Sequence, residues 1–177
     1  MVMGLAYLLT GSNLGNRWQH ISDALASIGR MAGEVTAFSS VYESPAWGFR
    51  HPIPFLNQAI RLRTDLLPRE LLDLLIEIES QMGRKRKGNG YEARNIDIDI
   101  LLYDNLVMEE EGLVIPHPRM HLRRFALLPL ADIDEDIYHP GFRRNIQTLL
   151  ETCPDKSGIE LFNGPYPFED EGGEDAL

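Results

Sequence analysis

The sequence predicts an α+β domain in which helices cover an antiparallel sheet. Two observations point to this class. Apolar residues alternate with polar ones over short segments, as in strands, and recur every three or four residues over longer segments, as in helices. In the first hundred residues these segments follow the order strand, helix, strand, strand, helix, strand, without an internal repeat. That order predicts a ferredoxin-like βαββαβ sandwich with its helices on one face of the sheet.

The first half of this order lies before residue 43. Residues 3–9 form an almost continuous apolar run, which predicts a buried strand closed by a turn at residues 11–16. A helix is expected over residues 17–31, with apolar side chains on one face and Asn16 as its N-cap. Residues 35–42 are the second expected strand.

The second half of the order ends at residue 102. Apolar and polar side chains alternate over residues 55–63, which predicts the third strand. Pro68 suits the first position of the next helix, which we expect to end near Gly83. The fourth strand is expected within residues 94–102.

The remaining residues predict an extra C-terminal hairpin and helices. We expect a hairpin around Asp104 and Asn105, a proline-bounded turn at residues 116–118, and helices over residues 122–131 and 145–152.

Length and charge limit the possible classes of protein. The chain has 177 residues and a net charge of −10, with five acidic and no basic residues after position 167. We expect one domain over residues 1–163 and a disordered acidic tail over residues 164–177. The charge disfavours nucleic acid and anionic membrane as partners, and the single Cys153 excludes an internal disulfide. A monomer in a reducing cytoplasm is expected.

The segment 94–101 carries the most informative pattern, RNIDIDIL. Alternation places Asp97 and Asp99 on one face of a strand, roughly 6–7 Å apart. Like charges at that spacing raise each other's pKa, so a counter-charge is expected. Either divalent cations bind the two carboxylates, or the pair belongs to a solvated face answered by a neighbouring Arg or Lys. The segment alone does not decide between these readings.

Basic residues lie on both sides of this acidic strand. The run at residues 84–87 is RKRK, Arg94 precedes Asp97 by three residues, and Arg123 follows His117 on a later connection. Arginine forks suit phosphate oxygens, and carboxylates hold the magnesium that polyphosphates carry. Together they indicate a nucleoside triphosphate with its metal. A solvated surface is the plainer reading of the basic run, and a turn residue that of His117.

A proline-rich segment at residues 44–54 predicts a long shaped loop, and loops of this kind are often functional. Asn57 follows it and carries an amide able to pair with the edge of a heterocycle. Four aromatic side chains in or near the loop and the later helix could stack on a flat ligand or pack in the core: Trp47, Phe49, Phe55 and Phe125.

The turn at residues 11–15, GSNLG, lies between a strand and a helix. It matches neither of the common glycine-rich phosphate-binding patterns. We therefore expect a structural strand-to-helix turn, with a phosphate loop as the alternative.

With these motifs in order, the chain resembles the 6-hydroxymethyl-7,8-dihydropterin pyrophosphokinases of folate biosynthesis. The resemblance extends from the first strand to about residue 150. Its signature is Arg94 to Leu101, and the matching motifs around it are GSNL at 11–14, SP at 44–45, FLN at 55–57, IE at 78–79 and PHPRM at 116–120. The family's ferredoxin-like fold agrees with the order of elements above.

The resemblance implies transfer of the terminal pyrophosphate of ATP to the pterin hydroxymethyl group, leaving AMP. It implies that Asp97 and Asp99 bind two Mg²⁺ ions and, with Arg84 and Arg94, form the catalytic set. The implied ATP-binding residues are Glu79, Arg84, Arg86, Arg94, Ile100, His117 and Arg123. The implied pterin-binding residues are Ser44, Pro45, Trp47, Phe55, Asn57, Tyr91 and Phe125. Residues 46–54 and 84–93 would be mobile loops that close over both substrates.

The chain departs from the family pattern just before the signature. Some members carry Arg-Trp where this sequence has Gly90 and Tyr91. Tyr91 could replace the tryptophan as a lid over the pterin, and Lys87 could compensate for the arginine.

Two rival functions are considered, and the first belongs to another class of protein. A ferredoxin-like module that binds a nucleotide or RNA through its sheet would need aromatic residues on the open face and a basic surface. The acidic charge and the acidic signature strand disfavour it. The second rival is an enzyme of the same fold that transfers a different phosphoryl group.

Overall fold

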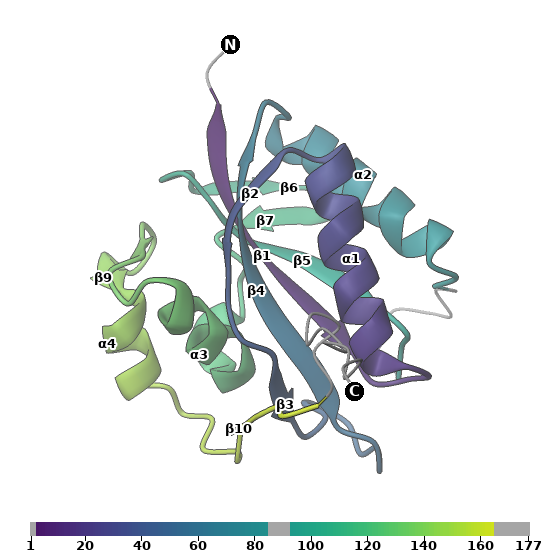
Figure 1. The fold of residues 1–177 in the computed structure, drawn as a ribbon. Coiled ribbons are helices and arrows are strands. Elements are labelled where there is room, and N and C mark those ends of the chain that lie inside the picture. Colours follow the sequence, from purple (N-terminus) through teal and green to yellow (C-terminus); the bar gives the residue numbers. More distant parts are fainter. Residues whose placement is uncertain (1–2, 85–92, 165–177) are drawn as a thin grey trace, which may run out of the picture.

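The computed structural model describes residues 3–84 and 93–164, and its centre is an antiparallel sheet (Figure 1). The strands follow the order β10-β3-β4-β1-β5. In addition, β2 pairs with residues 60–63 of β4, whereas β3 pairs with residues 55–57. The elements up to the acidic strand are β1 (Gly4–Ser12), α1 (Arg17–Met31), β2 (Glu34–Phe38), β3 (Tyr42–Ser44), β4 (Phe55–Thr64), α2 (Pro68–Gln81) and β5 (Asp97–Tyr103).

Helices pack on both faces of this sheet (Figure 1). Side chains alternate across each strand, so β1 sends Leu8 into the core under α1 and α2 and sends Leu9 into the core under α3 (Arg124–Ile133) and α4 (Ile146–Glu151). On β4, Ile60 and Ala59 divide between the two cores in the same way. Both helices of the first hundred residues lie on one face, and the C-terminal helices cover the other.

The expected elements of the first hundred residues form, with one correction. α1 begins and ends as expected, and the side chain of Asn16 accepts a hydrogen bond from the Gln19 N–H at 3.1 Å, as an N-cap does. The single strand expected over residues 35–42 is wrong, because β2 ends before Ser39. The Ser39 hydroxyl, rather than a backbone carbonyl, accepts the hydrogen bond from the Ala59 N–H, which interrupts the ladder.

The C-terminal part contains the expected types of element in shifted positions. The chain turns at Asp104, but the hairpin expected there is wrong, since β6 (Met108–Glu110) pairs with β7 (Leu113–Ile115) around Gly112. Gly112 has φ +73°, which suits glycine at this tight turn. The later helix starts at Arg124, two residues after its expected start, because a 3₁₀ turn (η1, Met120–Leu122) precedes it.

Three two-residue strands were not expected, because they are too short to show alternation: β8 (Tyr138–His139), β9 (Arg144–Asn145) and β10 (Glu160–Leu161). β10 adds an edge strand beside β3 (Figure 1). Among the described residues, no helix is long and apolar enough to cross a membrane.

The N-cap of α1 gives a stability prediction. Replacing Asn16 by Ala removes the acceptor for an otherwise unpaired N–H, so the free energy of unfolding should fall by about 1 kcal/mol in urea titrations. Ser27→Ala, on the same helix away from the cap, is the control and should change it by less than about 0.5 kcal/mol. Equal effects of the two variants would contradict the capping role.

Candidate active site

One cavity of about 340 Å³ opens at the end of the sheet where β1 and β4 meet the start of β5. The acidic, basic and aromatic side chains of its lining come from β4, β5, α3 and the connections around them, and β1 and β3 add further residues. The lining residues are Leu9, Gly11, Ser44, Pro45, Trp47, Phe49, Phe55, Asn57, Arg84, Arg94, Asp97, Asp99, His117, Arg119, Arg123 and Phe125.

β5 brings the two carboxylates to this cavity. Asp97 and Asp99 line its wall, whereas Ile98 and Ile100 point through the sheet into the core under α1 and α2. Burial, followed by repulsion from Asp97, raises the pKa of Asp99 to about 7. An acid pair under this mutual repulsion is a suitable ligand for a cation.

Two arginines hold Asp97 from opposite sides. Nη1 of Arg84 lies 2.6 Å from Oδ1 of Asp97, and Nη1 of Arg94 lies 2.8 Å from Oδ2. Charge-assisted hydrogen bonds of this length are among the strong ones in proteins. The strand's carboxylate therefore orients both guanidinium groups at the cavity wall.

Glu79 lies behind this wall rather than in it. Glu79 is 2% exposed. Its Oε1 accepts a hydrogen bond from the Ile98 N–H at 2.8 Å and lies 2.6 Å from Nη1 of Arg84. Burial alone would lower the pKa of Arg84, but the charges of Asp97 and Glu79 outweigh it and raise that pKa. Glu79 thus orients the Arg84 guanidinium and links it to the backbone of β5.

His117 presents a hydrogen-bond donor to the cavity. Its Nδ1 accepts the Arg119 N–H at 3.2 Å, so in the neutral ring the proton sits on Nε2. Burial, followed by the charges of Arg123 and Arg119, lowers the pKa of His117 to about 4. The ring is therefore neutral at physiological pH.

Another part of the cavity lining is aromatic, and it adjoins the arginines, since Cζ of Arg94 lies 5.9 Å from the Phe55 centroid. The rings of Trp47 and Phe125 meet edge to face with centroids 6.5 Å apart, and Cζ of Arg123 lies 4.7 Å from the Trp47 centroid. Phe49 and Phe55 form a second edge-to-face pair at 6.1 Å. These surfaces suit a flat ligand, and Arg123 belongs to this aromatic group as well as to the cationic lining.

An amide supplies polar recognition on the aromatic side. Asn57 is 2% exposed, and its Nδ2 donates to Oγ of Ser44 at 2.8 Å, which directs its Oδ1 to act as an acceptor. A Cβ at Gly11 would lie 3.6 Å from that Oδ1. The bare backbone at Gly11 therefore keeps space beside the acceptor.

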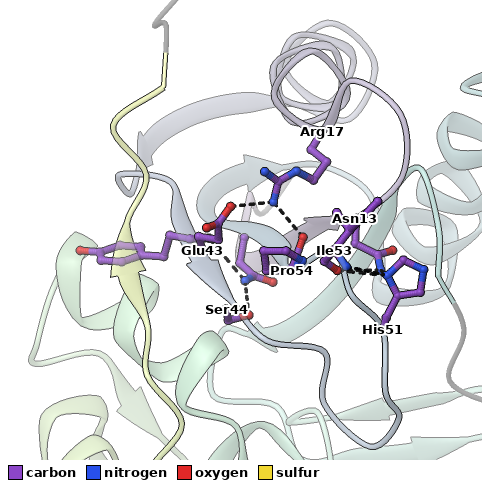
Figure 2. A network of polar contacts seen from close by, with 9 residues as sticks. Asn13, Arg17, Glu43, Ser44, His51, Ile53 and Pro54 are labelled. Atoms are coloured by element: carbon purple, nitrogen blue, oxygen red, sulfur yellow. Dashed lines mark hydrogen bonds and ion pairs between the residues drawn. The ribbon is translucent and has the colours of Figure 1, made fainter.

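The turn after β1 joins the loops on both sides of the cavity. The Asn13 N–H donates to the Arg94 carbonyl at 3.0 Å, and its Oδ1 accepts the Arg94 N–H at 2.7 Å. Its Nδ2 reaches Nδ1 of His51 at 3.3 Å and the Ile53 carbonyl at 3.4 Å (Figure 2). These hydrogen bonds agree with the expected structural turn between β1 and α1, and they also anchor the proline-rich loop.

The cavity brings together most of the described residues expected from sequence, but two of them do not line it. Ile100 has its side chain in the core under α1 and α2, and Glu79 is behind the wall. Arg86 and Tyr91 lie outside the described residues, as do Gly90, Lys87 and the tail from residue 165.

Sequence reasoning did not assign three of the lining residues to the site: Leu9, Gly11 and Arg119. Gly11 and Arg119 stand in motifs that match the family pattern, so a signal existed for these two. Leu9 ends an apolar run and carried no such signal.

A cavity with paired carboxylates and arginines at one end and flat aromatic surfaces at the other defines an enzyme class. It is typical of transferases that move a phosphate-containing group from a nucleotide to a flat acceptor. Residues 7–135 match the model of the 7,8-dihydro-6-hydroxymethylpterin-pyrophosphokinase family. The chain belongs to this family, so the resemblance drawn from its motifs is confirmed.

Relatives of nearly the same length support the assignment. The 2-amino-4-hydroxy-6-hydroxymethyldihydropteridine pyrophosphokinase of Aquifex aeolicus is 39% identical over 145 residues, which cover 82% of this chain and 89% of the relative. The enzyme of that name from Bacillus subtilis is 40% identical over 160 residues, which cover 89% and 95%.

Solved structures share the fold. Wild-type HPPK-DHPS of Plasmodium falciparum superposes with a TM-score of 0.70 at 15% identity, over 85% of this chain. The match covers 45% of that longer protein, so this chain spans less than half of it. The likeness concerns the fold alone.

The neutral state of His117 gives a pH prediction. Its folded-state pKa of about 4 lies below the ordinary value, so protons bind the unfolded chain more tightly. The stability contributed by His117 is therefore full above about pH 6.5 and is lost as the pH falls toward 4. Between pH 7 and 5, the wild type should lose about 1–2 kcal/mol more unfolding free energy than His117→Asn.

Urea titrations at both pH values measure this difference, and the asparagine keeps an acceptor for the Arg119 N–H. An equal loss in the two proteins would contradict the lowered pKa. An NMR titration of the His117 ring is the control, because its signals should stay constant above about pH 5.5.

Proposed function

We propose that this chain transfers the β,γ-pyrophosphate of ATP to the hydroxymethyl group of 6-hydroxymethyl-7,8-dihydropterin. The products are AMP and the pterin diphosphate, an intermediate of folate biosynthesis. The observation that carries the proposal is one cavity that joins an acid–arginine end to an aromatic–amide end, in a chain of this family.

The acid–arginine end would bind ATP. Arg84 and Arg94 project from the two sides of Asp97, and the neutral His117 offers its Nε2–H to a phosphate oxygen. When the polyphosphate enters, the two guanidinium groups would exchange carboxylate for phosphate oxygens. Glu79 would keep Arg84 oriented during this exchange, and the backbone of Ile100 would take part in nucleotide binding. Arg86 belongs to this set as a sequence prediction.

The carboxylates fit magnesium. Mg²⁺ prefers oxygen ligands and is commonly held by one or two carboxylates, with substrate phosphates and water completing its shell. No group of three or more His, Cys, Asp and Glu side chains within residues 3–84 and 93–164 could hold a metal by itself, which agrees with a shell shared with ATP. Asp97 and Asp99 would hold two Mg²⁺ ions, which would neutralise phosphate charge and acidify the attacking hydroxyl.

The aromatic–amide end would bind the pterin. Trp47, Phe55 and Phe125 supply ring surfaces, and the carbonyl oxygen of Asn57 can accept from an N–H on the heterocycle edge. Ser44 and Pro45 complete this side, and Tyr91 joins it as a sequence prediction. Arg123 stacks on Trp47 and lines the same cavity, so its guanidinium could contact the pyrophosphate as it passes from ATP to the pterin.

The chemistry requires mainly positioning. The hydroxyl oxygen of the pterin bonds to the β-phosphorus, the bond from that phosphorus to the α,β-bridging oxygen breaks, and the hydroxyl proton is released. In-line attack gains most from holding both substrates rigidly and from countering the developing negative charge. The arginines would do this together with the Mg²⁺ that Asp97 and Asp99 would hold. No strong protein base is needed, and Asp97 is a secondary candidate for that role.

The proposal includes several features of the whole chain. The order β3-β4-β1-β5 with α1 and α2 on one face supports a ferredoxin-like classification. Residues 1–163 would act as one catalytic domain with small-molecule substrates, as a cytoplasmic monomer without nucleic acid or membrane partners.

Nucleotide analysis tests the reaction. With ATP, Mg²⁺ and 6-hydroxymethyl-7,8-dihydropterin, the protein should form AMP in a pterin-dependent manner, which chromatographic separation of the nucleotides measures. Formation of ADP would indicate a different phosphoryl transfer. Binding without turnover would favour the non-catalytic module.

Asp97 gives the sharpest mutational test. Asp97→Ala removes a proposed metal ligand and the partner of two arginines, so kcat should fall roughly 100-fold or more. Asp73→Ala, an exposed residue of α2, is the matched control and should keep wild-type turnover. Circular dichroism should show both variants folded. Near-full activity of Asp97→Ala with Mg²⁺ would disprove the metal role.

A further inference from the structure

We infer that Arg17, Glu43 and Phe162 form a brace that positions the pterin-binding side of the cavity. Phe162 directly follows β10, and none of the three residues lines the main cavity. The inference rests on the proposed function, because it assigns these residues to the positioning of the pterin-binding loop rather than to fold stability in general.

Ser44 and Pro45, which the brace is inferred to position, border two cavities. Ser44 and Pro45 line the main cavity and also a second hollow of about 320 Å³ behind it. The outer wall of that hollow includes Gly158 and Glu160 from the C-terminal segment. Ser44 is held by its pairing with Phe55 on β4 and by the hydrogen bond from Asn57, whereas Pro45 lies beyond β3 and is exposed. Contacts at the two ends of the loop can therefore set the position of the chain that begins at Pro45.

Arg17 supplies such contacts at both ends of the proline-rich loop. Its Nη1 donates to Oε2 of Glu43 at 2.7 Å and to the Pro54 carbonyl at 2.8 Å (Figure 2). Glu43 directly precedes Ser44, and Pro54 directly precedes Phe55. One guanidinium nitrogen at the start of α1 thus clamps the chain next to a pterin-pocket residue on each side of the loop.

The C-terminal segment holds Arg17 in this position. Phe162 stacks on Trp18 with ring centroids 5.9 Å apart and an interplanar angle of 22°, and Cζ of Arg17 lies 5.9 Å from the Phe162 centroid. The Phe162 N–H donates to the Val41 carbonyl at 2.9 Å, continuing the pairing of β10 with β3. The Phe162 ring therefore packs on Trp18 and lies within cation–π distance of Arg17.

Charge makes the parts of the brace interdependent. β10 pairs Glu160 directly opposite Glu43 on β3, and like charges in that position destabilise a strand pair. The ion pair of Arg17 with Glu43 offsets this repulsion. Loss of Arg17 should loosen β10 as well as the loop, and loss of Phe162 should loosen Arg17.

The brace also extends the site beyond the residues matched by the family model. That match ends at residue 135, whereas β10 and Phe162 follow residue 159. The C-terminal segment of this chain would therefore contribute to substrate binding without contacting the substrate.

Two variants of the full chain test the brace. In Arg17→Met and Phe162→Ala, the Kd of 6-hydroxymethyl-7,8-dihydropterin should rise roughly 5- to 20-fold, the loss expected for one or two partly buried polar or aromatic contacts. Fluorescence titration with a non-hydrolysable ATP analogue and Mg²⁺ present measures it. The Kd of the analogue should stay within about twofold, since the arginines around Asp97 are untouched.

Arg63→Met is the matched control, because it removes an exposed ion pair with Glu34 elsewhere on the sheet and should leave both Kd values unchanged. Arg17→Lys, which keeps the charge beside Glu43, should recover part of the pterin affinity and decides the question if Arg17→Met does not fold. Unchanged pterin affinity, or equal weakening of pterin and analogue, would overturn the brace. Failure of the wild type to bind pterin would instead refute the proposed function on which the brace depends.

Discussion

The site depends on the ion pairs at Asp97. Arg84 follows the end of α2 and Arg94 lies just before β5, so one carboxylate joins the two ends of the connection between these elements. Glu79 adds a second acid under Arg84 and binds the backbone of β5. These bonds place cations and carboxylates within contact of one another, the arrangement that a metal–polyphosphate complex requires.

The sheet also fixes the positions of the other residues that line the cavity. Ile98 and Ile100 anchor β5 in the core, so Asp97 and Asp99 stand on a strand that cannot rotate without exposing apolar surface. β1 lies between β5 and β4, and its terminal turn bonds Arg94 through Asn13. The charged and aromatic ends are thus fixed by one antiparallel framework, while the loop from residue 44 to 54 is held by a few polar contacts.

Sequence patterns predicted regular elements well where periodicity was long. α1 and α2 begin where the caps and Pro68 indicated, since those signals act within a single turn. The strand expected over residues 35–42 failed at Ser39 because a side-chain hydroxyl replaced a ladder acceptor. The hairpin expected at Asp104 failed because the turn residues mark where a chain bends and carry no information on which strands pair afterwards.

The sequence by itself determined that two carboxylates share one strand face, that arginines flank them and that an aromatic loop precedes the third long strand. Those features follow from local periodicity and composition, and with the ordered motifs they identified the family. Only the tertiary structure decided that Arg123 stacks on Trp47, that Glu79 lies behind the wall and that Arg17 meets both ends of the loop. These contacts join residues distant in sequence, and side-chain packing in three dimensions sets them.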